Sequence, residues 1–143
     1  MLRICALILT ACCLVLPLSA FADDKKEDAA VKEIDLKGAK FGLPKGKADM
    51  PTVLKSAEEL AKAIPDVEVQ AKVKKEVDFA KQQLLFFAWS GSGGDRLAYN
   101  VEKGEKGPLV VFLYTRGLTR DLRGHVHLFA LPKDATWKVV PAK

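Results

Sequence analysis

The arginines of this chain are concentrated in its second half, where they suggest the chemistry of anion recognition. Of the 23 lysines and arginines only five are arginines, and four of these follow residue 90: Arg96, Arg116, Arg120 and Arg123. A guanidinium group forms two parallel hydrogen bonds to a carboxylate, phosphate or sulfate, a geometry that a lysine does not offer. The cluster therefore predicts either a site for an anionic ligand or acidic protein, or internal pairing with Asp95 and Asp121.

A serine- and glycine-rich segment lies in the same part of the chain. Ser90-Gly91-Ser92-Gly93-Gly94-Asp95 follows an apolar run that ends at Trp89. Glycine-rich turns can point several backbone N–H groups at one anion. The segment is neither a nucleophile elbow nor a P-loop, because it lacks a glycine two residues before Ser92 and a Gly-Lys-Ser/Thr sequence. Trp89 is predicted to be either a core side chain or the floor of a cleft.

His125 and His127 are the two histidines of the chain, and they share one face of a predicted strand. Two histidines at this spacing can bind one metal ion, with Asp95 or Asp121 as a further ligand. A relay of Ser92, His125 and Asp121 would instead indicate a hydrolase. Neither pattern is specific. A small metal-dependent or Ser/His hydrolase is thus an alternative to a non-catalytic module, for which no catalytic residue, metal or cofactor is predicted.

Two helices are predicted ahead of these residues. Ser56-Ala57-Glu58-Glu59 is a capping box, and the helix that it starts ends before Pro65. Asp66 caps a second helix, in which valines at four-residue spacing, Val69 to Val77, form one apolar stripe. After Asp78 the periodicity changes, and strands are predicted over 84–90, 95–102, 109–115 and 125–131, with a last one around 137–139.

This order of elements predicts an α+β fold, an antiparallel four- to five-stranded meander sheet with one or two N-terminal helices packed on one face. The runs 84–89 and 109–114 are continuously apolar, so both faces of these strands need to be covered. Pairing in chain order brings the loops 90–95 and 116–124 to the same end of the sheet. The predicted ligand-binding residues at that end are Ser90, Ser92, Asp95, Arg96, Arg116, Arg120, Arg123 and Trp89.

The amino terminus is typical of a secretory signal peptide. Residues 1–22 combine a basic residue at position 3, an apolar run over 4–18 and the cleavage motif Ala20-Phe21-Ala22. Cleavage there predicts a secreted or periplasmic protein with no transmembrane span in the mature chain. The lipobox-like Leu9-Thr10-Ala11-Cys12 gives the alternative of a lipoprotein anchored at Cys12.

The loss of residues 1–22 also removes Cys5, Cys12 and Cys13, so the mature chain has no disulfide and no thiol nucleophile. The 143 residues carry a net charge of +5 and are 49% hydrophobic, which suffices for one packed domain. Residues 23–50 are predicted to be a charged, partly disordered leader, and 51–143 a single domain. Export argues against nucleic acid as the partner of this basic chain and favours an extracytoplasmic protein or an anionic ligand.

The stretch from Val77-Asp78-Phe79 to Ala130-Leu131-Pro132-Lys133 resembles the C-terminal domain of the protease complex subunit PrcB. The similarity covers about residues 52–133 and consists of a Ser-capped helix, an Asp-Phe strand start, a glycine-rich loop and the strands that follow. That family has a Thr-Gly-Gly-Tyr type loop where this chain has Ser92-Gly93-Gly94-Asp95. The chain also looks like small exported bacterial proteins. The resemblance implies a non-catalytic module that binds or stabilises another protein; a structural envelope-associated protein without a ligand is a further alternative.

Overall fold

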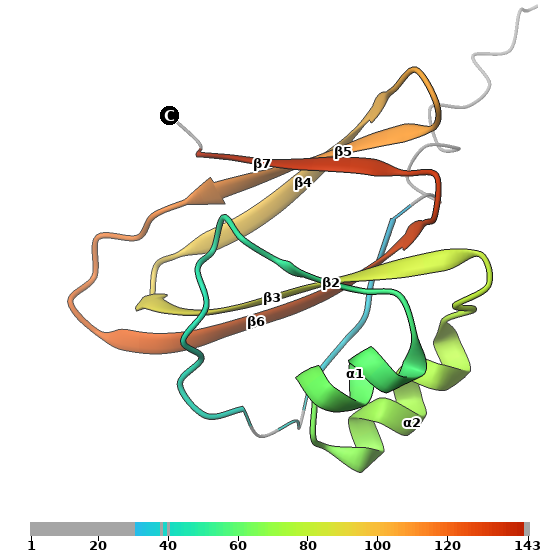
Figure 1. Ribbon diagram of the computed structural model, residues 1–143. Helices are drawn as coiled ribbons and strands as arrows, with labels where there is room; N and C mark the ends of the chain where they lie inside the picture. The colour runs from blue at the N-terminus through green and yellow to red at the C-terminus, as the bar shows by residue number, and fades with distance from the viewer. Residues whose placement is uncertain (1–30, 38, 40, 142–143) are drawn as a thin grey trace, which may run out of the picture.

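The computed structural model describes residues 31–37, 39 and 41–141, which form three layers (Figure 1). A pair of helices, a four-stranded sheet and a three-stranded sheet are stacked in that order. The predictions for residues 1–30, among them the signal peptide and the fate of Cys12, lie outside the described residues. Within the described ranges, no helix is long and apolar enough to cross a membrane.

The two helices begin at the predicted capping residues. Ser56 accepts a hydrogen bond from a backbone N–H of α1 (Ala57–Ala63), and Asp66 accepts two from α2 (Val67–Glu76). These bonds satisfy N–H groups that have no partner within the first turn of a helix. Val73, in the middle of the predicted apolar stripe, is fully buried. The helix predictions are therefore confirmed.

The strands form two sheets. Sheet A has the order β1 (Lys32–Glu33), β6 (Leu122–Pro132), β3 (Gln82–Ser92), β2 (Thr52–Leu54), and all of its pairs are antiparallel. Sheet B has the order β4 (Arg96–Lys103), β5 (Pro108–Thr115), β7 (Thr136–Pro141), with β4 antiparallel and β7 parallel to β5. The α+β class, an antiparallel sheet and helices on one of its faces are thus confirmed.

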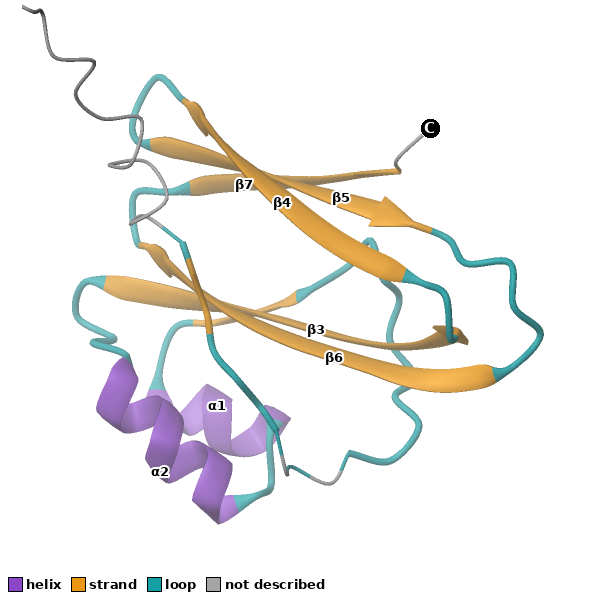
Figure 2. Cartoon of the chain, turned by 180° about the vertical axis from the view of Figure 1, so that it is seen from behind, coloured by secondary structure: helices purple, strands orange, loops and turns teal. Residues whose placement is uncertain are grey.

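The pairing of strands does not follow the chain order throughout. β3 pairs with β6 along its whole length, from Gln82 opposite Pro132 to Ser92 opposite Leu122. The expected pairs of β3 with β4 and of β5 with β6 are wrong. The pair of β4 with β5 forms as expected, and β2 and β3, which the two helices separate in the chain, also pair. The chain crosses from sheet A to sheet B after β3 and returns after β5 (Figure 2).

The two-sheet arrangement covers both faces of β3. Leu84 and Phe86 pack against the helices, whereas Leu85 and Phe87 pack against sheet B. The ring of Phe87 lies 4.8 Å from that of Phe112 in sheet B, measured between centroids. A strand that is buried on both faces is apolar at every position rather than at alternate ones. Sheet B therefore provides the second cover that the sequence of this strand requires.

The folded region begins before residue 51. β1 pairs with β6, and Ile34 is 2% exposed in the core between helices and sheet A. Val31 and Ala48 are buried in the core between the sheets. The predicted boundary at Pro51 is therefore too late for the described residues. The alternation of Ile34 and Leu36 with charged residues favours a short edge strand, but the charges and glycines of residues 23–50 led to the prediction of a leader outside the domain.

Candidate functional site

The β3–β4 and β5–β6 connections lie side by side at one end of the two sheets (Figure 1). We call this region, residues 92–95 and 116–121, the loop end. The hydroxyl oxygens of Ser92 and Thr119 are 2.7 Å apart across it. The predicted proximity of the two loops is therefore present, but it arises because Ser92 pairs with Leu122 in sheet A and Arg96 with Thr115 in sheet B.

The backbone N–H groups of the glycines are already engaged within the loop end. Gly93 N–H donates to Asp121 Oδ1 at 3.1 Å, and Gly94 N–H donates to Thr119 Oγ1 at 3.1 Å. A Cβ atom on Gly117 would collide with the backbone of Gly94, so the two loops need glycine where they meet. The glycine-rich turn thus binds the chain's own oxygen atoms, and its N–H groups do not form an open nest for an external anion.

Asp95 is the buried polar centre of the loop end, with 8% of its surface exposed. Its Oδ2 accepts hydrogen bonds from Trp89 Nε1 and from the Tyr114 hydroxyl, both at 3.0 Å. Its Oδ1 accepts one from Gly117 N–H at 2.8 Å. Bonds from an ionised carboxylate to three donors are among the stronger hydrogen bonds of proteins. Asp95 therefore ties β3, β5 and both loops together.

The pKa values of Asp95 and Tyr114 are shifted by the same contacts. Burial alone raises the pKa of Asp95, but the hydrogen bonds from Gly117, Trp89 and Tyr114 outweigh it, so the pKa lies below its ordinary value. Burial raises the pKa of Tyr114, and the hydrogen bond to Asp95 raises it further. Asp95 is thus ionised and fully engaged at neutral pH, which suits a structural anchor better than a ligand contact.

Two of the predicted arginines stand free at the loop end. Arg116 and Arg120 are exposed, and neither forms an ion pair or a side-chain hydrogen bond in the described part of the chain. Both line an open hollow of about 590 Å³. Ser90 and Ser92 line the same hollow, although Ser90 Oγ is held by the carbonyl of Pro44 at 2.7 Å. The hollow therefore combines two unpaired guanidinium groups with hydroxyls and with the carboxylates of Asp95 and Asp121, which are already bonded to other groups of the chain.

Arg123 is paired within the chain. Its Nε donates to Asp121 Oδ2 at 2.6 Å. Thr119, the Gly93 N–H and Arg123 lower the pKa of Asp121 to about 2. The sequence left internal pairing and anion recognition open for these arginines, and the structure divides them, with Arg123 paired and Arg116 and Arg120 free.

Three predicted residues lie outside the hollow: Arg123, which pairs with Asp121, and also Trp89 and Arg96. Trp89 is 3% exposed and packs between the sheets, where it stacks on His125 with centroids 4.9 Å apart. It borders a separate hollow of about 460 Å³ near residues 46–49 and 139–141, so it is not the floor of the arginine site. Arg96 is exposed at the start of β4 and does not line the hollow. Neither side chain therefore belongs to the arginine hollow: Arg96 is on the exposed face of β4, and Trp89 is in the core, where its Nε1 donates to Asp95.

Sequence reasoning missed two exposed leucines, one in the β5–β6 connection and one at the start of β6. Leu118 is 95% exposed and Leu122 is 66% exposed, and both line the arginine hollow. The signal is visible in the sequence, because Leu118 and Leu122 alternate with Arg116 and Arg120 in a segment that carries no strand signal. Large apolar side chains on an exposed tip are typical of contact surfaces.

The histidines contact the backbone and a glutamate. His125 Nε2 lies 2.8 Å from the carbonyl oxygen of Ser92, and His127 Nδ1 lies 3.0 Å from Glu33 Oε1. The Ser92 hydroxyl faces Thr119 and Asp121 faces Arg123, so Ser92, His125 and Asp121 do not form the relay considered above. In the ranges that the structure describes, no three His, Cys, Asp or Glu side chains are grouped to hold a metal ion.

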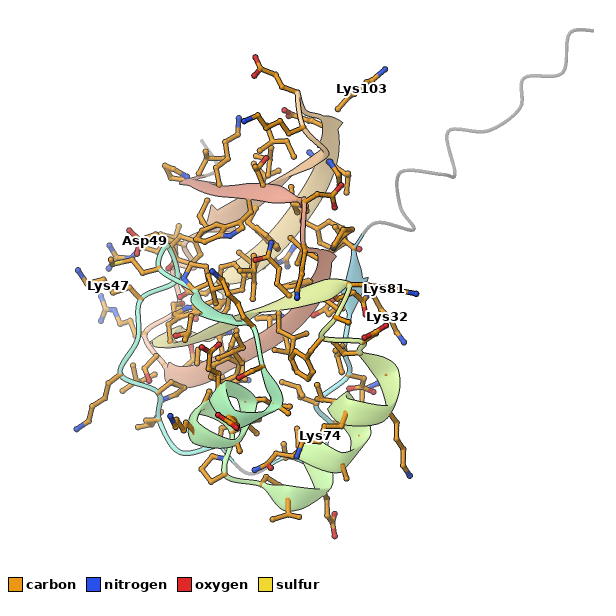
Figure 3. All side chains as sticks on the ribbon, turned by 45° about the vertical axis from the view of Figure 1, so that its right-hand side comes forward. Lys32, Lys47, Asp49, Lys74, Lys81 and Lys103 are labelled. Carbon is orange, nitrogen blue, oxygen red and sulfur yellow. The ribbon has the colours of Figure 1, made fainter. Side chains whose placement is uncertain are left out.

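The lysines show the opposite distribution to the arginines. Figure 3 labels five of them, of which Lys32 and Lys81 lie near each other and Lys47, Lys74 and Lys103 lie on other parts of the molecule. Lys74 projects from α2 and Lys103 ends β4, far from the loop end. Such a spread serves solubility, whereas Arg116 and Arg120 line one hollow.

Comparison of the chain with protein-family models, with curated proteins and with solved structures finds no match. The similarity to the C-terminal domain of PrcB therefore stays a prediction from the sequence.

Proposed function

We propose that this chain is an exported, non-catalytic binding module whose loop end contacts an acidic protein surface. The observation that carries the proposal is the state of Arg116 and Arg120, which line one hollow without a carboxylate partner in the described part of the chain. Arginine is enriched among residues that dominate binding energy, because its planar group forms several directed hydrogen bonds.

The neighbouring leucines favour a protein over a small anion. Leu118 and Leu122 expose most of their surface beside the arginines. Burial of a leucine side chain against a partner contributes about 1.5–3 kcal/mol. A small inorganic anion offers no apolar surface to them, whereas an acidic protein segment with apolar side chains matches both groups. The scaffold is suited to binding because Asp95 and Asp121 hold the loops in one arrangement.

An NMR titration tests the proposal with two probes, a synthetic peptide of alternating Glu and Leu and inorganic phosphate. We expect the peptide to shift the amide signals of residues 116–122. The double variant Arg116→Ala, Arg120→Ala should weaken peptide binding at least about tenfold, because two charge-assisted contacts are lost. The matched control, Lys74→Ala with Lys75→Ala, removes the same charge from the exposed face of α2 and should bind as the natural chain does.

The variant Leu118→Ser separates the two ligand classes. It should weaken binding of the peptide and leave that of phosphate unchanged. Equal losses for the arginine variant and the lysine control would mean that the peptide senses only net charge, and the loop end would not be the site. Binding of phosphate alone would indicate a small-anion site. Binding of neither probe would favour the structural alternative.

A further inference from the structure

β4 leaves one long edge of sheet B open. β5 pairs with it on one side, and no strand of the described residues pairs on the other. An edge strand carries a row of N–H and C=O groups that can accept another strand. β4 pairs with β5 at each of its eight positions, and it contains no proline and no bulge. The edge is therefore regular enough to receive a strand along its full length.

The side chains of β4 alternate strictly. Leu97, Tyr99 and Val101 face sheet A and are half-buried. The side chains of the other face are exposed: Arg96, Ala98, Asn100 and Glu102. Neither Arg96 nor Glu102 has an ion pair or a side-chain hydrogen bond in the described part of the chain. Arg96, which lies outside the arginine hollow, is thus available for another contact.

We propose that a second copy of this chain pairs antiparallel with β4, with Tyr99 opposite the partner's Tyr99. This register places Arg96 opposite the partner's Glu102 and Leu97 opposite the partner's Val101. Ala98 then faces the partner's Asn100. The opposite charges meet twice, once on each side of the two-fold axis, and the half-buried apolar side chains meet each other. Directly opposed pairs of these kinds stabilise an antiparallel ladder.

The neighbouring registers lack this match. Side chains keep to their own face only when the pairing shifts by an even number of residues. A shift that centres the pair on Ala98 sets Val101 opposite the partner's Asp95. A shift that centres it on Asn100 sets Leu97 opposite the partner's Lys103. Both shifts place a charged residue opposite an apolar one and separate Arg96 from the partner's Glu102, so self-complementarity selects the register centred on Tyr99.

The resulting dimer has one continuous sheet in which the two β4 strands are central. Because these strands run in opposite directions, the two loop ends lie at opposite ends of the dimer. The inference is independent of the proposed function, since it uses neither Arg116 nor Arg120. A single added strand pair buries little surface, so the association is expected to be weak and concentration-dependent.

Sedimentation velocity over a wide range of protein concentrations tests the dimer. We expect the natural chain to dimerise as its concentration rises. Arg96→Glu and Glu102→Arg should each weaken dimerisation about tenfold, because two attractions become two repulsions. The combination of both substitutions in one chain should restore it. Lys138→Glu on β7 and Glu105→Arg in the β4–β5 hairpin are exposed controls with the same charge changes, and they should dimerise normally.

Cross-linking tests the register in a chain whose Cys5, Cys12 and Cys13 are replaced by alanine. A mixture of the Ala98→Cys and Asn100→Cys variants should form a disulfide-linked dimer under mild oxidation, and either variant alone should form much less, because these two positions face each other. A monomer at every concentration would overturn the proposal. So would a dimer that is insensitive to both charge reversals, or equal cross-linking of the mixture and the single variants.

Discussion

Replacement of Asp95 by asparagine tests whether this carboxylate holds the loop end together. The side chain is 8% exposed and accepts three hydrogen bonds, two at Oδ2 and one at Oδ1. Asparagine has one acceptor oxygen, and its NH₂ group can only donate. If the oxygen stays beside Trp89 and Tyr114, the Gly117 N–H faces a donor and loses its partner.

The expected change in the free energy of unfolding follows from these contacts. The loss of a hydrogen bond to a charged group costs about 1.5–3 kcal/mol, and a buried donor left without a partner costs about 1–3 kcal/mol. These contributions overlap, because the loops can shift to admit water. We therefore expect Asp95→Asn to lower the free energy of unfolding by about 2–4 kcal/mol at pH 7.

The effect should depend on pH in a defined direction. The folded pKa of Asp95 is below its ordinary value of 3.8, so the carboxylate stabilises the fold fully above about pH 4. This contribution is lost as the pH falls through the folded pKa. The difference in stability between the natural chain and the variant should therefore narrow below about pH 4.

Urea denaturation followed by tryptophan fluorescence measures both effects, because Trp89 is buried beside Asp95. Asp49→Asn is the matched control, since Asp49 is exposed and has no hydrogen bond or ion pair in the described part of the chain. Figure 3 shows Asp49 beside Lys47, away from α2. The control should change stability by less than about 0.5 kcal/mol. A similarly small effect of Asp95→Asn at pH 7, or a difference that does not narrow in acid, would refute the anchoring role.

Two further measurements probe the contact between the loops. Gly117→Ala should lower the free energy of unfolding by about 1–3 kcal/mol, because its Cβ would collide with the backbone of Gly94, whereas Gly42→Ala, with open space around it, should be nearly neutral in the same denaturation experiment. The carboxyl carbon of Asp121 should titrate by NMR with a midpoint of about 2, since Thr119 and its neighbours hold the pKa there; a midpoint near 3.8 would show that these contacts do not persist in solution.

Local signals predicted the secondary structure well. The caps at Ser56 and Asp66 lie within a few residues of the helices that they start, so sequence spacing alone identifies them. After Asp78 the four-residue period likewise ends, and continuously apolar or alternating runs mark the strands. The place of the segment before residue 51 in the fold was not predicted, because β1 is two residues long and its partner β6 lies far along the chain.

The candidate site was predicted in part. Ser92 and Arg120 were expected at one end, and they are there, although the pairing behind this expectation was wrong for β3. The expectation survived because either arrangement of the strands places both connections at the same end. The division between paired Arg123 and free Arg120 could not be predicted, because it depends on which carboxylate lies within about 4 Å of each guanidinium.

The sequence by itself determined the helices, the strands and the chemical groups of the loop end, because these follow from short-range periodicity, caps and residue types. Only the tertiary structure decided that β3 pairs with β6 and that β4 becomes an open edge. Both outcomes depend on which part of the chain covers the second face of β3. Many different strand orders are compatible with the same pattern of apolar residues. The choice among them comes from the packing of whole layers, to which contacts such as that of Phe87 with Phe112 contribute.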